Sequence, residues 1–496
     1  MVPETVSHFI GGRYAHSTLR KSYGVTDPAT GKEYAQVEVG LAADVNQAVL
    51  AARTALETGP WPGLAAADRA QVLYGIADAI DARAVDIAAA EALGPGLPVT
   101  QAREQVARAG GLFRLAADLI TERAAADEAR GPGQSGYVAT SPAGVAGLIT
   151  PWRTPFLAQA RAVAPALAAG AAIVLKPDEW APLPAALLAE ITTAAGLPDG
   201  VLNIVHGSLH RRAPGAQARD ALIAHPAVAR VSFDGDAATG QQIVLDAATH
   251  RKSLSAELAR DSPCLIFADA DLDQATDSAL FGAFALNGQR RTATSTIGVQ
   301  RPVYDTVVSR LAQRAERIRV GDPSDPATEL GPLPHPEHYD KLMSSVRLGV
   351  REGARLAAGG RRPAGLPEGN FLAPTVLADV EPSMQIFSEQ IGGPVVRVTA
   401  FDTDDEAISL ANAVTDPTAA YIWTCDRQRA RRLAAAIESA GTWVNSHNPQ
   451  DLRTPVQGHR PGLPGAAAGD VNIDFYLRSR TVLVAADETP VPRFGA

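Results

Sequence analysis

The chain opens with two strand-like segments and then changes to helical periodicity. HFIGGRY and DPATGKEYAQVEVG combine short alternating apolar runs with Gly and Pro turns, which predicts strands joined by tight turns. From residue 42 to about 93, and from about 99 to 126, apolar residues recur at helical spacing in alanine-rich sequence. Strands followed by long helices therefore precede the first break in the pattern, at DEARGPGQSG.

Short apolar runs and helical stretches alternate in the rest of the chain. The runs AAIVLKP, VLNIVHG and ARVSFDG have the length of buried parallel strands, and LAQARAVAPALAAG and LPAALLAEITTAAG beside them have helical spacing. A second alternating region extends from about residue 262 to 424 and includes the strand-like PCLIFAD, TIGVQ and PVVRVTAF. This alternation is typical of α/β proteins, and it predicts a doubly wound, Rossmann-type domain followed by a second α/β domain.

Composition narrows the possible partners and compartments. The formal net charge is −9 and the basic residues are dispersed among acids, so we expect no nucleic-acid partner. Two cysteines cannot form a disulfide framework, and no cluster has the spacing of a metal site, so we expect no metal and a reducing cytoplasm. Because no run of about 18 apolar residues and no signal-like N-terminus occurs, we expect no membrane contact.

The segment from residue 147 to 183 carries a recognisable combination of motifs. GLITPWRTPFLAQARAVAPALAAGAAIVLKPDEWAPL runs through a strand, a Pro-Trp turn, a helix and a second strand that ends at Lys176. It resembles the aldehyde dehydrogenase superfamily, whose members carry a Pro-Trp-Asn turn and a Lys-Pro-x-Glu strand end in this order. The resemblance extends over essentially the whole chain, through SFDGDAATG, SPCLIFADADLD, NFLAPTVL and TWVNSHNPQDLRTP. Within the superfamily, the sequence resembles the hydroxymuconic semialdehyde dehydrogenases.

The resemblance implies an aldehyde dehydrogenase-like fold in three parts. A dinucleotide-binding, Rossmann-like domain is expected over residues 1–130 and 149–258, and an α/β catalytic-type domain over 259–473. A hairpin at 131–148 and a C-terminal strand at 474–496 are expected to form an oligomerisation extension. Because such strands pair across subunits in similar proteins, the resemblance implies a homodimer or homotetramer.

Residues at strand ends suggest where a dinucleotide would bind. Lys176 and Glu179 follow a buried parallel strand, and an ammonium donor beside a carboxylate acceptor suits ribose hydroxyls. In similar proteins these residues bind the adenosine ribose. Gly235 and Gly240 belong to a turn at a helix N-terminus, which can bind pyrophosphate. The alternatives are a solvated strand end for the first pair and an ordinary Gly-containing turn for the second, because no G-x-G-x-x-G motif is present.

The resemblance adds Trp152 and Gln390 to the cofactor residues, together with departures from the family pattern. The family segment Glu-Glu-Ile-Phe-Gly-Pro, which holds the nicotinamide ribose, reads EQIGGP here, so Gln390 replaces a carboxylate. Ala259 and Arg260 replace the glycines of Glu-Leu-Gly-Gly-Lys, where side chains hinder a close approach of the nicotinamide. NAD or NADP is therefore the implied cofactor, with its binding weakened or lost.

The catalytic positions depart further from the family. Glu257 matches the general base that activates water. In the loop FALNGQRRTATSTIGVQ, Asn287 keeps its place in the Asn-Gly-Glu/Gln motif, but Arg291 stands at the position of the nucleophilic cysteine. A guanidinium is never a nucleophile in a protein. Arg153 stands where the family has the asparagine that stabilises the oxyanion. The candidate catalytic set is Glu257, Arg291, Arg153 and Asn287.

No other side chain is expected to replace the missing thiolate. Cys264 lies in a hydrophobic strand and Cys425 near a strand end, so both are expected to be core thiols. Thr292 and Ser295 have no histidine beside them in sequence, and a hydroxyl without a base is a poor nucleophile. We therefore expect loss of cysteine-dependent aldehyde oxidation on an intact fold.

Several functions remain open at this stage. The pocket could bind a small anionic molecule, or act on it without redox chemistry, with Arg153, Arg290 and Arg291 as its cations and Glu257 as a base. We expect the anion between Arg153 and Arg291, because two guanidinium groups directed at one small volume repel each other. The alternatives are a non-catalytic oligomeric partner protein and an NAD(P)-dependent (semi)aldehyde dehydrogenase that acts by an unusual route. The arginines could also fold back onto Glu257 as a salt bridge.

Overall fold

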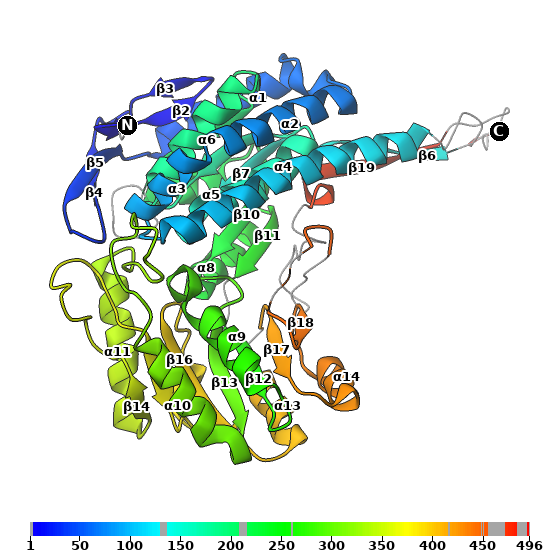
Figure 1. The fold of residues 1–496 in the computed structure, drawn as a ribbon. Helices are drawn as coiled ribbons and strands as arrows, with labels where there is room; N and C mark the ends of the chain where they lie inside the picture. Colours follow the sequence, from blue (N-terminus) through cyan, green and yellow to red (C-terminus); the bar gives the residue numbers. More distant parts are fainter. Residues whose placement is uncertain are drawn as a thin grey trace.

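The computed structural model contains two α/β domains, drawn one above the other in Figure 1. Each domain has a seven-stranded sheet, and two smaller sheets are attached to the first domain. The structure describes residues 3–128, 136–207, 216–258, 261–414, 417–447, 449, 451–454, 472–483 and 494–495. The departures predicted at Ala259 and Arg260 lie outside these ranges.

The first sheet is doubly wound, as its alternating pattern predicts. Its strands occur in the order β11 (Ser253–Leu258), β10 (Val228–Gly235), β7 (Val145–Ile149), β8 (Ala172–Lys176), β9 (Leu202–Ile204), β2 (His8–Ile10) and β3 (Arg13–Ala15). The first five are parallel, whereas β2 is antiparallel to its neighbours. The helices of this domain are α1 (Ala42–Glu57), α2 (Ala66–Ala82), α3 (Ala84–Leu93), α4 (Val99–Glu128), α5 (Pro155–Ala168), α6 (Pro182–Ala194), α7 (Ala216–Ala224) and α8 (Ala237–Thr249).

Helices cover both faces of this sheet because successive strand residues point to opposite sides. On β8, Ile173 and Leu175 pack in a core with α2, α4, α5 and α6, whereas Ala172 and Val174 pack with α1, α7 and α8. A buried Leu or Ile stabilises the fold by roughly 1.5–3 kcal/mol relative to an exposed one. The continuous apolar run of this strand, which follows from burial on both faces, confirms the α/β fold class.

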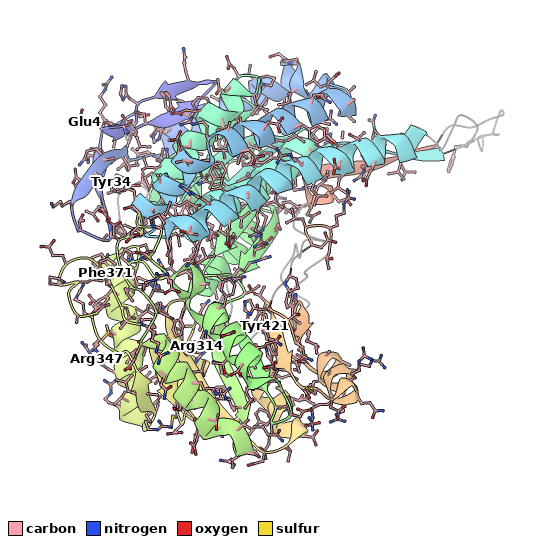
Figure 2. All side chains as sticks on the ribbon, viewed as in Figure 1. Glu4, Tyr34, Arg314, Arg347, Phe371 and Tyr421 are labelled. Atoms are coloured by element: carbon pink, nitrogen blue, oxygen red, sulfur yellow. The ribbon has the colours of Figure 1, made fainter. Side chains whose placement is uncertain are left out.

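The second domain repeats the arrangement with a different strand order. Its strands are β14 (Arg355–Ala358), β15 (Thr375–Ala378), β16 (Val395–Phe401), β13 (Thr294–Gln300), β12 (Ser262–Ile266), β17 (Ala420–Trp423) and β18 (Thr442–Val444). Its helices are α9 (Leu272–Phe284), α10 (Tyr304–Ala315), α11 (Pro336–Glu352), α12 (Gln385–Ser388), α13 (Asp404–Asn412) and α14 (Arg427–Ala436). Two cores again enclose the sheet, and Tyr421 of β17 belongs to the one on the side of α9 and α10 (Figure 2).

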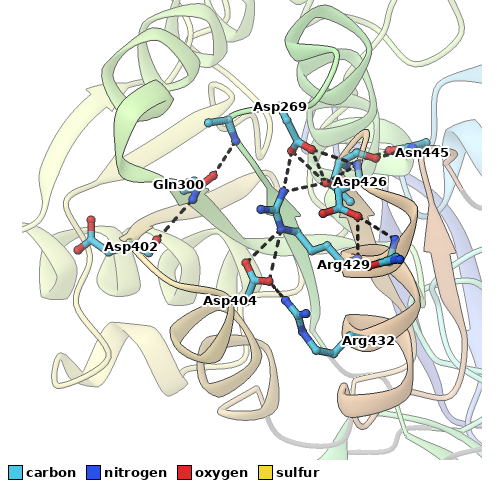
Figure 3. A network of polar contacts seen from close by, with 11 residues as sticks. Asp269, Gln300, Asp402, Asp404, Asp426, Arg429, Arg432 and Asn445 are labelled. Atoms are coloured by element: carbon cyan, nitrogen blue, oxygen red, sulfur yellow. Dashed lines mark hydrogen bonds and ion pairs between the residues drawn. The ribbon is translucent and has the colours of Figure 1, made fainter.

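Ion pairs close the carboxyl edge of the second sheet. Arg429 of α14 pairs with Asp269, which follows β12, at 3.1 Å, and with Asp404 at the start of α13, also at 3.1 Å (Figure 3). Asn445, which follows β18, exchanges hydrogen bonds with the backbone of Thr424, which follows β17. Because these polar groups satisfy one another, this edge is tied together rather than open to a ligand.

The opposite, amino edge of the second sheet faces the carboxyl edge of the first. The loop before β13 reaches the first domain, since Asn287 donates to the carbonyl oxygen of Gly96 at 2.9 Å. One cavity is lined by residues that follow β7, β8 and β10 and also by His338 of α11. Strand ends from both domains therefore meet between them.

Two strands form a ribbon that projects from the first domain (Figure 1). β6 (Gly136–Pro142) pairs antiparallel with β19 (Leu477–Leu483), which follows the short turn of Asp474–Tyr476. The hairpin expected at 131–148 differs from this, because β7, which overlaps its end, lies in the first sheet. The partner of β6 is the C-terminal strand, which was expected to join this extension. Of the helices in the described ranges, none combines the length and apolar character needed to cross a membrane.

A three-stranded sheet covers the other end of the first domain, with β1 (Thr5–Val6), β5 (Glu33–Glu38) and β4 (Ser22–Thr26) in that order. Short 3-10 turns occur at Trp61–Gly63, Ala285–Gly288, Arg301–Val303 and Asp474–Tyr476. The second of these precedes β13 and contains two residues with left-handed backbone conformation, Leu286 and Asn287. The left-handed backbone at these two residues changes the direction of the chain just before Arg290 and Arg291.

Candidate active site and cofactor cleft

Adjacent parallel strands place most of the predicted site residues at one edge. Trp152 and Arg153 follow β7, Glu179 follows β8, Gly235 ends β10 and Glu257 lies near the end of β11. These four strands are neighbours in the sheet, and carboxyl ends of parallel strands share one edge. The arrangement that follows from the strand pattern is therefore present in the structure.

Arg291 and Glu257 form a direct ion pair across the domain boundary. The distance from Arg291 Nη1 to Glu257 Oε2 is 2.5 Å, and the two side chains are 21% and 22% exposed. A half-enclosed, charge-assisted contact of this kind is stronger than a neutral hydrogen bond. The salt-bridge alternative thus describes Arg291, and the carboxylate at the family's general-base position is engaged by a cation.

Arg290, the neighbouring arginine, points elsewhere. Its guanidinium carbon lies 4.9 Å from the centre of the Phe281 ring, and its Nη1 is 3.5 Å from Nε2 of His447. Among the described residues it forms no ion pair with a carboxylate. Burial lowers the pKa of Arg290, and Tyr421 and Glu104 oppose this shift. The salt-bridge alternative is wrong for this residue.

Asn287 holds the loop in place. Its side-chain nitrogen donates to the carbonyl oxygens of Gly96 at 2.9 Å and Pro332 at 3.0 Å, and its oxygen accepts from the backbone N–H of Gly331 at 2.8 Å. Both amide N–H groups are occupied, and the residue is fully buried. Asn287 therefore acts as an anchor between the domains rather than as a donor to a reacting atom.

Arg153 lines a cavity of about 240 Å³ together with Trp152, Glu179, Gly235 and Gln390. We call this space the cofactor cavity, because most of the predicted cofactor residues line it. Four of the six predicted cofactor residues thus surround one volume. The Arg153 guanidinium carbon lies 5.6 Å from the centre of the Trp152 ring, a distance typical of a cation–π contact.

The charges around Arg153 differ from those that the sequence led us to expect. Burial lowers the pKa of Arg153, and the carboxylates of Asp234, Asp236, Asp261 and Asp178 oppose the shift. Arg153 therefore faces carboxylates in the cofactor cavity, whereas the charge of Arg291 is matched by Glu257. The electrostatic argument for an anion between the two arginines is therefore weaker, because Arg291 pairs with Glu257 and several carboxylates lie near Arg153.

Two aspartates between the end of β10 and the start of α8, Asp234 and Asp236, were missed by sequence reasoning. Asp236 is the N-cap of α8, and its carboxylate accepts from the backbone N–H of Thr239 at 2.9 Å. Burial, together with the nearby charge of Glu257, raises the pKa of Asp234 to about 6. Both line the cofactor cavity. The signal was present in FDGDAATG, where an acid stands on each side of Gly235.

Lys176 and Gly240 have roles within the protein. The Nζ of Lys176 donates to the carbonyl oxygen of Pro177 at 3.0 Å, and burial lowers the pKa of Lys176 to about 8. Gly240 packs against Leu258, since a Cβ at this position would lie 2.2 Å from the Leu258 Cδ2 atom. Neither lines the cofactor cavity, although Gly240 lets α8 approach the end of β11.

Aromatic side chains from both domains enclose the cavity. The rings of Trp180 and His335 stack at 4.6 Å, and those of Trp152 and His338 meet edge-on at 5.3 Å. His338 Nε2 lies 3.0 Å from the carbonyl oxygen of Gly392, and burial lowers the pKa of His338 to about 3. This histidine is therefore neutral, with Nε2–H as the donor. The contact joins α11 to the EQIGGP segment.

The two thiols lie in different environments. Cys264 on β12 is buried, and burial raises the pKa of its thiol to about 12, so it is not a thiolate at neutral pH. Cys425 is exposed, which makes the expectation of a core thiol wrong for this residue. It follows β17, at the carboxyl edge that the ion pairs close, and β12 and β17 meet the candidate site at their opposite ends.

Comparison with known proteins agrees with this architecture. The Aldehyde dehydrogenase family model matches residues 14–482. The 5-carboxymethyl-2-hydroxymuconate semialdehyde dehydrogenase of Escherichia coli is 40% identical over 92% of this chain and 96% of its own length. The 2-hydroxymuconic semialdehyde dehydrogenase of Pseudomonas sp. (strain CF600) is 36% identical over 97% of this chain and 99% of its own length.

Solved structures give the same result. HpcC from Thermus thermophilus has a TM-score of 0.91 and 38% identity, covering 99% of this chain and 95% of that chain. The NAD+ complex of an aldehyde dehydrogenase from Bacillus cereus has a TM-score of 0.90 and 32% identity, with 98% of each chain covered. The chain therefore belongs to the aldehyde dehydrogenase family.

Proposed function

We propose that this protein has lost cysteine-dependent aldehyde oxidation and binds a small anionic molecule. The observation that carries the proposal is the ion pair between Arg291 and Glu257. In the family pattern these positions hold the nucleophile and the general base. A guanidinium forms no thiohemiacetal, and the Glu257 carboxylate is turned to a cation at 2.5 Å rather than to a water that it would activate.

The same ion pair favours binding over a repurposed non-redox reaction. A reaction of that kind needs a base in the pocket, and the base that the sequence offered is Glu257. With that carboxylate engaged by Arg291, the pocket keeps polar groups that recognise a ligand but lacks a free base at this position. The two relatives are semialdehyde dehydrogenases by name, and we propose that this protein keeps their fold without their chemistry.

The residues of the cofactor cavity do not fit a pyrophosphate. A helix N-terminus binds phosphate through free backbone N–H groups and positive potential. At the start of α8 the N–H of Thr239 is taken by Asp236, and Asp234 adds a second carboxylate to the cavity. Like charges about 5 Å apart cost roughly 3 kcal/mol near a protein surface. We propose that NAD or NADP binding is weakened or lost for this reason.

The cation that we assign to the anionic ligand is Arg290. Arg291 is neutralised by Glu257, and Arg153 faces the carboxylates of the cofactor cavity. Arg290 is instead enclosed without a carboxylate partner among the described residues, beside a cavity of about 820 Å³. An enclosed cation is costly unless an anion compensates its charge.

The proposal includes a cytoplasmic homodimer or homotetramer. The β6–β19 ribbon projects from the domain, and Val138 on β6 is 54% exposed there. Both long edges of a two-stranded ribbon offer backbone groups for pairing with another chain. The free thiols Cys264 and Cys425 are compatible with a reducing compartment.

We predict that the purified protein forms no NADH from NAD with aliphatic, aromatic or semialdehyde substrates. The missing nucleophile should lower the rate by roughly 10⁴-fold or more. The rate of NADH formation is measured from the absorbance of NADH. Turnover that persists in Arg291→Ala and disappears in Glu257→Gln would contradict the proposal and support hydride transfer by another route.

A second prediction concerns the cofactor cavity. Asp236→Ser keeps a capping oxygen for the N–H of Thr239 but removes one carboxylate, so NAD affinity measured by calorimetry should rise about tenfold or more. Asp246→Ser is the matched control, because it removes the same charge from the far end of α8. Low-micromolar binding of NAD to the natural protein, or equal affinities in all three proteins, would refute the charge argument.

A third prediction tests the ribbon. Val138→Lys places a charge on its exposed face and should shift the mass measured by light scattering toward the monomer. Val85→Lys, which changes a residue of α3 that is 63% exposed, should leave the assembly unchanged. A monomeric natural protein, or an oligomer that Val138→Lys leaves intact, would count against assembly through this surface.

A further inference from the structure

We propose that the cavity beside Arg290 is a carboxylate-binding site for an organic acid with an apolar body. We call it the Arg290 cavity. It has a volume of about 820 Å³ and is bounded by α4, α9, α10, the turn before β13 and His447. This inference deepens the proposed function and rests on it for the assignment of Arg290 as the ligand's cation.

The walls of the Arg290 cavity combine charged side chains with an apolar part beside the enclosed Arg290 guanidinium. Leu280, Phe281 and Phe284 of α9 and Ile318 beyond α10 supply apolar side chains. The cavity lies within the range of about 300–1,000 Å³ that is usual for sites of small molecules. An apolar chain or ring with a terminal carboxylate matches this combination.

Three other arginines line the wall of the Arg290 cavity: Arg108, Arg314 and Arg317. Arg108 has an interaction of its own, and Arg317 is exposed, so water solvates its charge. Arg314 of α10 (Figure 2) forms an ion pair with Asp277 of α9. Glu329 on the same wall accepts from the backbone N–H of Arg319 at 3.0 Å. Glu104 of α4 acts on Arg290 electrostatically but forms no ion pair with it. Arg290 is thus an enclosed cation of this wall that has no carboxylate partner among the described residues.

His447 fixes the direction of the Arg290 guanidinium. An arginine only donates, so Nε2 of His447, 3.5 Å from Arg290 Nη1, is the acceptor. Nδ1 then carries the proton and donates to the hydroxyl oxygen of Ser278 at 2.9 Å. The ring also stacks on Tyr421 at 4.8 Å. His447 is therefore a positioning residue that uses one N–H group of Arg290.

The remaining N–H groups of Arg290 define the ligand chemistry. A guanidinium has five N–H donors in a planar fork, and one contact to His447 leaves enough of them for a carboxylate. The ring of Phe281, 4.9 Å from the guanidinium carbon, covers one face and directs the donors sideways. A neutral amide of the same shape would bind less well, because it leaves the enclosed charge uncompensated.

The test uses sorbate, a six-carbon unsaturated carboxylate, with sorbamide as the uncharged control of equal shape. Calorimetry on the natural protein should show sorbate binding at least about tenfold more tightly than sorbamide. Arg290→Gln should lower the affinity for sorbate about tenfold or more, while Arg314→Gln, whose arginine is already paired, should stay within about twofold. His447→Phe keeps the stacked ring but loses the acceptor, so it should weaken binding by an intermediate factor of about three to five.

Folding is checked by comparing the melting temperatures of the variants with that of the natural protein. If Arg290→Gln does not fold, Arg290→Lys, which keeps the charge but not the fork, should bind sorbate more weakly than the natural protein and more tightly than sorbamide. Equal affinities for sorbate and sorbamide, no binding of sorbate, or unchanged affinity in the Arg290 variants would each overturn the inference. Formation of NADH from an aldehyde would refute the proposed function but not the carboxylate site. The calorimetric comparison tests that site separately, since it contains neither NAD nor an aldehyde.

Discussion

The contact between Arg291 and Glu257 is the constraint on which the proposed function of this protein depends. It joins the end of β11 in the first domain to the loop before β13 in the second, and both side chains are about one-fifth exposed. In the proposed function, each charge satisfies the other at the two positions that the family resemblance assigns to a nucleophile and a base. Removing one partner would take this contact from a charge that is largely enclosed, which is more costly than losing an exposed surface pair.

The surrounding frame is held by polar anchors that do not depend on this pair. Asn287 ties the loop to both domains through three hydrogen bonds. Arg397, which is 1% exposed, pairs with Asp261 at 2.7 Å and donates to the carbonyl oxygens of Ile386 and Phe387. Such anchors keep the EQIGGP segment and the start of β12 in place, so the site residues can change their chemistry without loss of the fold.

The sequence predicted the fold well because periodicity reports burial. The apolar run of β8 lies between two cores, and the neighbouring strand ends bring Trp152, Arg153 and Glu179 to one cavity. Contacts between distant side chains left no such pattern. Arg290 and His447 are 157 positions apart. Of the two arginines that the sequence placed around one anion, Arg291 pairs with Glu257, whereas Arg153 lies near a different group of carboxylates. The exposure of Cys425 was missed because a strand end is buried or exposed according to what packs on it.

The most direct test of this account is a double-mutant cycle on Arg291 and Glu257. Arg291→Met, Glu257→Gln and the double variant would be compared with the natural protein by chemical denaturation. The account predicts a coupling energy of about 1–3 kcal/mol, because each single change leaves the other charge without its partner. Additivity within about 0.3 kcal/mol would show that the two groups do not hold each other, and would contradict the claim that Glu257 is engaged as an ion-pair partner.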